Sequence, residues 1–177
     1  MGKKEKKMNG QDQPTTAPDG EARGALVSRG GLVASKLKPQ TAIAIAVDTA
    51  YVASKEGHVE TGIYMMDNRT NRGSADEGTL ELSTACNAGD LIGFEVYPID
   101  KLGPSGDAVV ITGFNVSQGD VFGSTGYPEK YDDTGAYWIG QAINAGSQTY
   151  QIRIAVTTGG LRPQTFNVYW DPFITAE

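Results

Sequence analysis

The chain of 177 residues has the length of one domain with some chain to spare, and its 39% hydrophobic content is enough for a core. Cys86 is the only cysteine and His58 the only histidine, so an internal disulfide is excluded and a zinc site built from these residue types is nearly excluded. No run of about 18 apolar residues predicts a transmembrane helix. No apolar segment follows the basic start as a secretory signal requires, so we expect a cytoplasmic protein, with release or secretion by another route left open.

Charge is distributed unevenly along the chain. Residues 1–40 carry eight basic and four acidic residues, including Lys3, Lys4, Lys6 and Lys7, and are too polar to bury much surface. We expect a flexible basic leader that either is a solvated tail or acts as an arm on an acidic surface, such as a second copy. Residues 41–177 carry seven basic and seventeen acidic residues, a net charge of −10, which argues against nucleic acid as a partner.

From Thr41 onward, short apolar runs alternate with period two between Gly-, Pro- and Asn-rich turns. The segment 107–118 is apolar on both sides, as a central strand would be. The pattern predicts a single all-β domain over 41–177, an antiparallel, jelly-roll-like β-sandwich of about eight strands. A closed barrel is the alternative. The predicted strands are 41–53, 62–66, 78–84, 90–99, 107–118, 136–143, 149–156 and 165–170.

One long connection, QGDVFGSTGYPEKYDDTG, is the first candidate for a functional site, because structureless loops of this length are often functional. Aromatic faces and carboxylates on one loop are typical of sugar binding, and carboxylates also bind calcium, although no EF-hand spacing is present. A solvated acidic loop is the alternative interpretation. The candidate ligand-binding residues are Tyr127, Tyr131, Asp132, Asp133, Tyr137 and Trp138.

Catalytic motifs are lacking. No GxSxG, Walker loop or HExxH occurs, and the glycine-rich pieces do not open helices. His58 is expected to be an exposed loop histidine, and Cys86 a small filler beside a turn. We therefore predict no catalytic residues, no metal site, no cofactor and no enzymatic activity.

The chain ends on VYWDPFI, a cluster of aromatic residues around an Asp-Pro pair. Alternation places Trp170 on the apolar face of the last strand. Pro172 keeps Asp171 out of the α conformation and cannot donate to a sheet ladder. We expect Asp171 to brace the strand end through nearby backbone N–H groups rather than to bind a ligand.

Several segments together resemble the AidA/PixA inclusion body proteins of bacteria. They are AIAVDTAYVA, GIYMMDN, LELSTACNAGDLIGFEV and the final stretch from Tyr137 to Ile174. Two features depart from the family: Gly93-Phe94 replaces the bulky or charged residues usual after the GD step, and residues 1–40 have no counterpart. The resemblance covers about 41–177 and implies a small β-sandwich without known enzymatic activity, associated with cytoplasmic inclusions. The matching positions are Asp48, Gly89, Asp90, Gly140, Trp170, Asp171 and Pro172.

Three functions from different classes follow. The favoured one is a non-enzymatic, self-associating structural or host-interaction protein, a homo-oligomer whose assembly weakens with salt if the arm and the acidic body attract one another. The alternative is a lectin-like glycan-binding module, for which the sandwich architecture is an analogy only. An enzyme that uses two carboxylates is the third. We expect neither nucleic acid nor membrane insertion.

Overall fold

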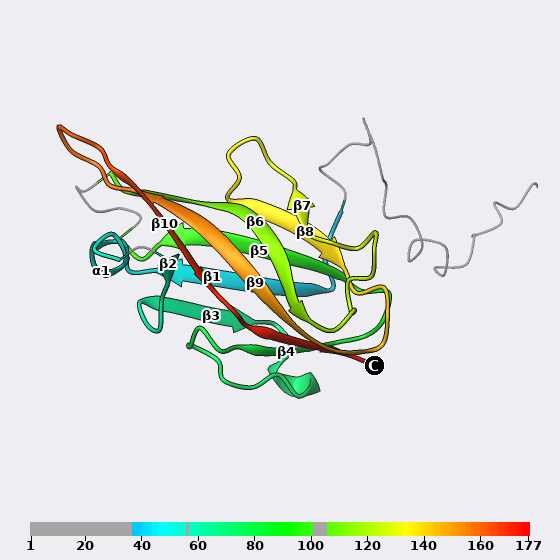
Figure 1. The fold of residues 1–177 in the computed structure, drawn as a ribbon. Coiled ribbons are helices and arrows are strands. Elements are labelled where there is room, and N and C mark those ends of the chain that lie inside the picture. Colours follow the sequence, from blue (N-terminus) through cyan, green and yellow to red (C-terminus); the bar gives the residue numbers. More distant parts are fainter. Residues whose placement is uncertain (1–36, 56, 101–105) are drawn as a thin grey trace, which may run out of the picture.

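The computed structural model describes residues 37–55, 57–100 and 106–177, which form two β-sheets packed face to face (Figure 1). Most of the predicted arm, with Lys3, Lys4, Lys6 and Lys7, lies outside these residues. In the described part of the chain, no helix is long and apolar enough to cross a membrane.

The first sheet has five strands. Within it β1 pairs antiparallel with β3 and parallel with β5, while β8 pairs antiparallel with both β5 and β7. Ile43, Ile45 and Val47 alternate with alanines along β1. One face of this strand therefore carries buried branched side chains, and the other face carries only small side chains. The order is β3 (Ile63–Asp67), β1 (Thr41–Val47), β5 (Leu91–Pro98), β8 (Tyr137–Gln141) and β7 (Glu129–Lys130).

The second sheet is organised around β9, its longest strand. One side of β9 pairs with β6, and the other side pairs first with β11 and then with β10. The short strands β2 and β4 add parallel to β10 and β11. The six strands are β2 (Gly57–His58), β4 (Ser83–Cys86), β6 (Ala108–Gln118), β9 (Gly146–Thr157), β10 (Thr165–Trp170) and β11 (Phe173–Ala176).

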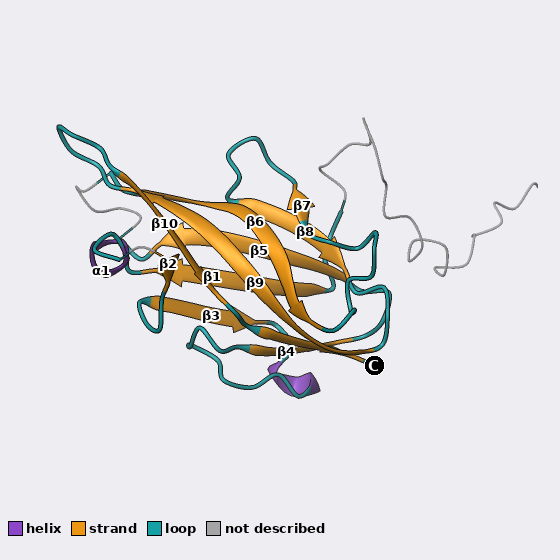
Figure 2. Ribbon diagram, viewed as in Figure 1, coloured by secondary structure: helices purple, strands orange, loops and turns teal. Residues whose placement is uncertain are grey.

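Helical structure is confined to two short turns in the described residues, α1 (Thr49–Val52) and η3 (Thr70–Arg72) (Figure 2). The predicted strand 41–53 is therefore too long. Asp48 ends it, because its carboxylate accepts a hydrogen bond from the N–H of Tyr51 at 3.1 Å and caps α1. Tyr51, which falls within that predicted strand, lies in α1 and is 42% exposed.

The core lies between the sheets. It joins the isoleucines of β1 to Ile152, Ile154 and Val156 of β9, all of which are fully buried. Aromatic rings fill one end, where Phe94 contacts Tyr150 edge-on with their centroids 5.9 Å apart. Burial of each large apolar side chain stabilises the fold by about 1.5–3 kcal/mol.

The sandwich is confirmed, but the purely antiparallel arrangement with about eight strands is wrong. Three of the pairings are parallel, and the described residues contain eleven strands, because β2, β7 and β11 are too short to show a period. The predicted central strand 107–118 corresponds to β6, which pairs only with β9 among the described strands. In the predicted strand 78–84, regular pairing with β11 begins only at Ser83.

Candidate functional surfaces

The predicted aromatic–carboxylate loop is held together by Asp132. Its carboxylate accepts from Thr134 Oγ1 at 2.8 Å and from the N–H groups of Gly135 at 2.7 Å and Tyr137 at 3.4 Å. Partial desolvation raises the pKa of Asp132, but these hydrogen bonds outweigh it, so the pKa lies below its ordinary value. Asp132 therefore closes a local turn, whereas Asp133 is exposed.

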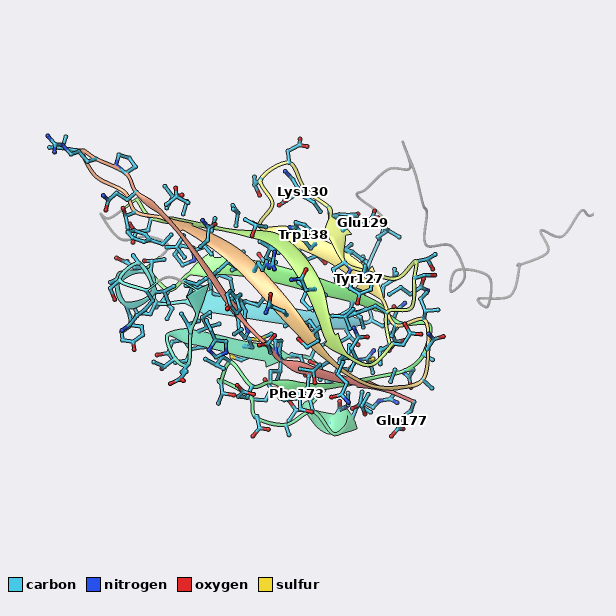
Figure 3. The ribbon with its side chains drawn as sticks, viewed as in Figure 1. Tyr127, Glu129, Lys130, Trp138, Phe173 and Glu177 are labelled. Carbon is cyan, nitrogen blue, oxygen red and sulfur yellow. The ribbon has the colours of Figure 1, made fainter. Side chains whose placement is uncertain are left out.

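The aromatic candidates are engaged with their own neighbours. The Trp138 indole N–H donates to Gly135 O at 3.0 Å and its ring packs on Phe114, 5.5 Å between centroids. Tyr131 and Tyr137 meet edge-on at 5.5 Å. The Tyr127 hydroxyl accepts from Gln148 Nε2 at 3.3 Å, and Figure 3 shows Tyr127 and Trp138 separated along this part of the sheet. These contacts give five of the six residues structural roles, Asp133 being the exception, and ligand binding by all six stays a prediction.

The other predicted motif positions serve the fold. The carboxylate of Asp90, which is mostly buried, accepts from Arg69 Nη2 at 2.8 Å and from Asn87 N at 3.1 Å. Gly89 has a φ of +94°, which glycine adopts without strain. At Gly140 a Cβ would lie 2.9 Å from Pro128 Cγ, so glycine is needed for close packing.

In the closing motif VYWDPFI, Trp170 belongs to the core and Asp171 lies at the surface. Trp170 is fully buried, as alternation predicted. Asp171 braces the strand end, but through side chains and not through backbone N–H groups as expected. It accepts from Ser117 Oγ at 3.1 Å and Gln151 Nε2 at 3.3 Å, and His58 Nε2 lies 4.0 Å from it. The carbonyl of Pro172 accepts from Tyr150 N at 3.1 Å.

Neither His58 nor Cys86 has the setting of a nucleophilic device. His58 is exposed on β2, with its ring 5.8 Å from that of Tyr169. Cys86 is buried, and burial together with the nearby Asp90 charge raises the pKa of its thiol to about 12. Among the described residues, no group of three or more His, Cys, Asp or Glu side chains could hold a metal ion.

The outer face of the first sheet is largely apolar, which was not predicted from the sequence. Across this face Ala44 pairs with Met66, and Ala46 lies between Tyr64 and Tyr97. Tyr64 and Met66 are 40% and 42% exposed. We call this surface, formed by Ala42, Ala44, Ala46, Tyr64, Met66, Glu95 and Tyr97, the alanine face. Its one charged member is Glu95, which is exposed and lies beside Ala44. The alternation of Ala with Ile in TAIAIAV was the available signal.

The outer face of the second sheet is polar and carries a groove of about 320 Å³. Its position depends on a bulge in β6, where Thr112 lies between Ile111, paired with Ile154, and Gly113, paired with Arg153. We call it the Arg153 groove. It is lined by Gly57, Thr112, Arg153, Ile154, Asn167, Val168 and Tyr169.

The comparisons with known proteins agree with this architecture. The described fold is similar to the crystal structure of the inclusion body protein PixA from Burkholderia cenocepacia J2315, with a TM-score of 0.62 and 21% sequence identity. The match covers 77% of this chain and 94% of that one, so the sandwich expected from the AidA/PixA resemblance is confirmed as a fold. No curated protein matches the chain. The model of the family described as Domain of unknown function (DUF8788) matches residues 39–161, more than half of the chain, and the protein therefore belongs to the DUF8788 family.

Proposed function

We propose that the protein is a non-enzymatic structural protein that associates with further copies of itself through the alanine face. The observation that carries this proposal is the contrast between the two outer faces. Side chains such as Asn115, Gln151 and Arg153 cover the second sheet, as expected where a sheet meets water. The first sheet instead presents alanines, Tyr64 and Met66, with Glu95 as the one carboxylate among them.

Small side chains favour stacking of two such faces. Sheets that pack face to face lie about 10 Å apart, and alanines on β1 allow this approach without long side chains having to be ordered. A second copy presents the same surface, so a two-fold axis pairs it with itself. The Tyr64 and Met66 side chains, at the edge of the alanine face, supply the adaptable apolar contacts.

The size of the face predicts how strong the association is. Three strands spaced by about 4.8 Å, with seven residues of about 3.3 Å each, cover about 330 Å² per copy. Two copies would bury about 660 Å², which is small even for weak and transient interfaces. Self-association therefore requires a high local concentration, as in a cytoplasmic inclusion. The similar fold of PixA, an inclusion body protein, supports the same proposal.

A concentration series tests the proposal. We expect the mean molar mass from light scattering to rise from that of a monomer of 18.8 kDa toward higher values as the concentration increases. The midpoint is expected in about the micromolar-to-millimolar range that a small interface supports. A mass that stays monomeric throughout this range would contradict self-association.

A further inference from the structure

The Arg153 groove has the dimensions of a ligand site and lies on the opposite sheet from the alanine face. Its volume of about 320 Å³ is at the lower end of the range for small-molecule sites. Gly113 pairs with Arg153 on the neighbouring strand and has no side chain to cover it. Gly57 lines the groove beside Tyr169.

Arg153 is a cation held in place without an anion. Its Nε donates to Gln151 Oε1 at 3.1 Å, and Gln151 is itself anchored by Asp171. With the amide of Asn115 turned so that its nitrogen donates to Phe114 O, the Asn115 oxygen accepts from Arg153 Nε at 3.2 Å and from Arg153 Nη2 at 2.5 Å. The other N–H groups of the guanidinium point away from these two bonds and are left for a ligand. In the described part of the chain no carboxylate forms an ion pair with Arg153.

This arrangement favours an external carboxylate. A guanidinium fork whose orientation is already fixed by amide oxygens loses little conformational entropy when it binds a carboxylate. Residues 41–177 have a net charge of −10, so the acidic surface does not attract anions in general. A charge-assisted hydrogen bond at one unpaired arginine is the interaction that offsets this repulsion.

The remaining lining groups match a sugar. The side chains of Thr112, Asn167 and Tyr169 have no hydrogen-bond partner among the described residues, and they line the same groove. Hydroxyl and amide groups both donate and accept, which is what the hydroxyls of a sugar require. Tyr169 adds an apolar ring surface with a polar tip, and the ring of His58 meets it edge-on.

We propose that the Arg153 groove binds an acidic sugar residue, such as a uronic acid. The carboxylate pairs with the guanidinium of Arg153, the hydroxyls hydrogen-bond to Thr112 and Asn167, and the sugar ring lies against Tyr169. Because the groove and the alanine face belong to different sheets, this binding is independent of self-association.

Heteronuclear NMR titration of the full chain with sodium glucuronate tests the proposal. We expect saturable shifts at the amides of residues around Arg153, Asn167 and Tyr169, with a dissociation constant in about the millimolar range. Arg153→Gln should weaken binding about tenfold or more, because it removes the charge-assisted bonds. The matched control is Arg162→Gln, the same change at an exposed arginine outside the groove, and it should leave binding unchanged.

Neutral and non-sugar probes decide the ligand class. We expect glucose, acetate and the amide of N-acetyl-glutamic acid each to bind about tenfold more weakly than glucuronate, because each lacks either the carboxylate or the sugar ring. Equal binding of acetate or of the glutamate amide would overturn the sugar assignment in favour of a general carboxylate or an acidic peptide. No saturable shift with glucuronate, or identical binding by Arg153→Gln, would overturn the site itself.

Discussion

The indole N–H of Trp170, on β10 in one sheet, donates a hydrogen bond to Sδ of Met65, on β3 in the other, over 3.1 Å. Both side chains are fully buried, so this contact connects the two layers of the sandwich at the end of the chain. Figure 1 shows the C-terminal strands crossing over β1 and β3. In the closing motif, Trp170 therefore stabilises the sandwich from within, while the neighbouring Asp171 faces outward.

Replacing Trp170 tests this role. Trp170→Ala should lower the free energy of unfolding by about 3–5 kcal/mol, because it leaves a large cavity between the sheets. Phe173→Ala is the control, since this neighbouring aromatic residue is 40% exposed and should cost less than about 1 kcal/mol. Urea unfolding measures both. A cost below about 1 kcal/mol for Trp170→Ala would refute the connecting role.

The ion pair between Arg69 and Asp90 should stabilise the fold far more than that between His58 and Asp171. Only 14% and 7% of the Arg69 and Asp90 side chains are exposed, and Arg69 Nε also donates to Thr41 Oγ1 at 2.8 Å. Asp90→Ala should cost about 3–5 kcal/mol, because it leaves an uncompensated buried charge.

His58→Ala should cost less than about 1 kcal/mol, because that pair is 4.0 Å long and partly exposed. Thermal unfolding of the two variants compares them. Equal losses of stability in Asp90→Ala and His58→Ala would show that burial of the Arg69–Asp90 pair does not determine how much it stabilises the fold.

The raised pKa of the buried Cys86 thiol predicts that the fold loses stability in alkaline solution. Its thiol ionises at a pKa of 9.0 when unfolded and at about 12 when folded, so above pH 9 the unfolded chain has lost a proton that the folded chain keeps. The free energy of unfolding should therefore be unaffected by this group below pH 9 and fall as pH rises from 9 toward 12, by at most about 1.4 kcal/mol per pH unit.

Cys86→Ala isolates this contribution. The variant should show a flatter dependence between about pH 9 and pH 10, before buried Tyr150, whose pKa is also raised by burial, adds a loss of the same sign. Urea unfolding across this range measures the slope. Identical slopes for the variant and the native chain would contradict the assigned cause.

Salt dependence separates two routes of self-association. If copies associate through the alanine face, sodium sulfate should strengthen the association, since it enhances burial of apolar surface. If the basic arm of residues 1–40 binds the acidic body of another copy, raising sodium chloride from about 50 to 500 mM should weaken it, because exposed charges are screened. Light scattering in each salt distinguishes the routes, and weakening in both would exclude the alanine face.

Alternation within strands was predictable from the sequence, because the side chains of Ile63 and Met65 or of Ile152 and Ile154 repeat at the period of a strand with one buried face. The parallel pairing of β1 with β5 was not, because a period says which face is buried and not which strand lies beside it. Asp48 was mistaken for a strand residue because its capping role depends on the short helix that follows.

The Arg153 groove could not be located in advance. Thr112 opens the Arg153 groove only because β6 has a bulge at this position of its register with β9, and Gly57 joins it from a segment about fifty residues away. The predicted loop site, by contrast, has the aromatic and acidic composition that is typical of a sugar-binding site. Asp132 and Trp138 nonetheless bond to their own loop, since short polar and aromatic side chains compete for nearby backbone groups.

The most direct test of self-association is sedimentation velocity of two matched variants at high concentration. Ala44→Arg places a long charged side chain on the alanine face, and Ala155→Arg makes the same change on the outer face of the second sheet. We predict that Ala44→Arg sediments as a monomer at concentrations where Ala155→Arg and the native chain both associate. Association of Ala44→Arg to the same extent as Ala155→Arg would contradict the central claim that copies meet through the alanine face.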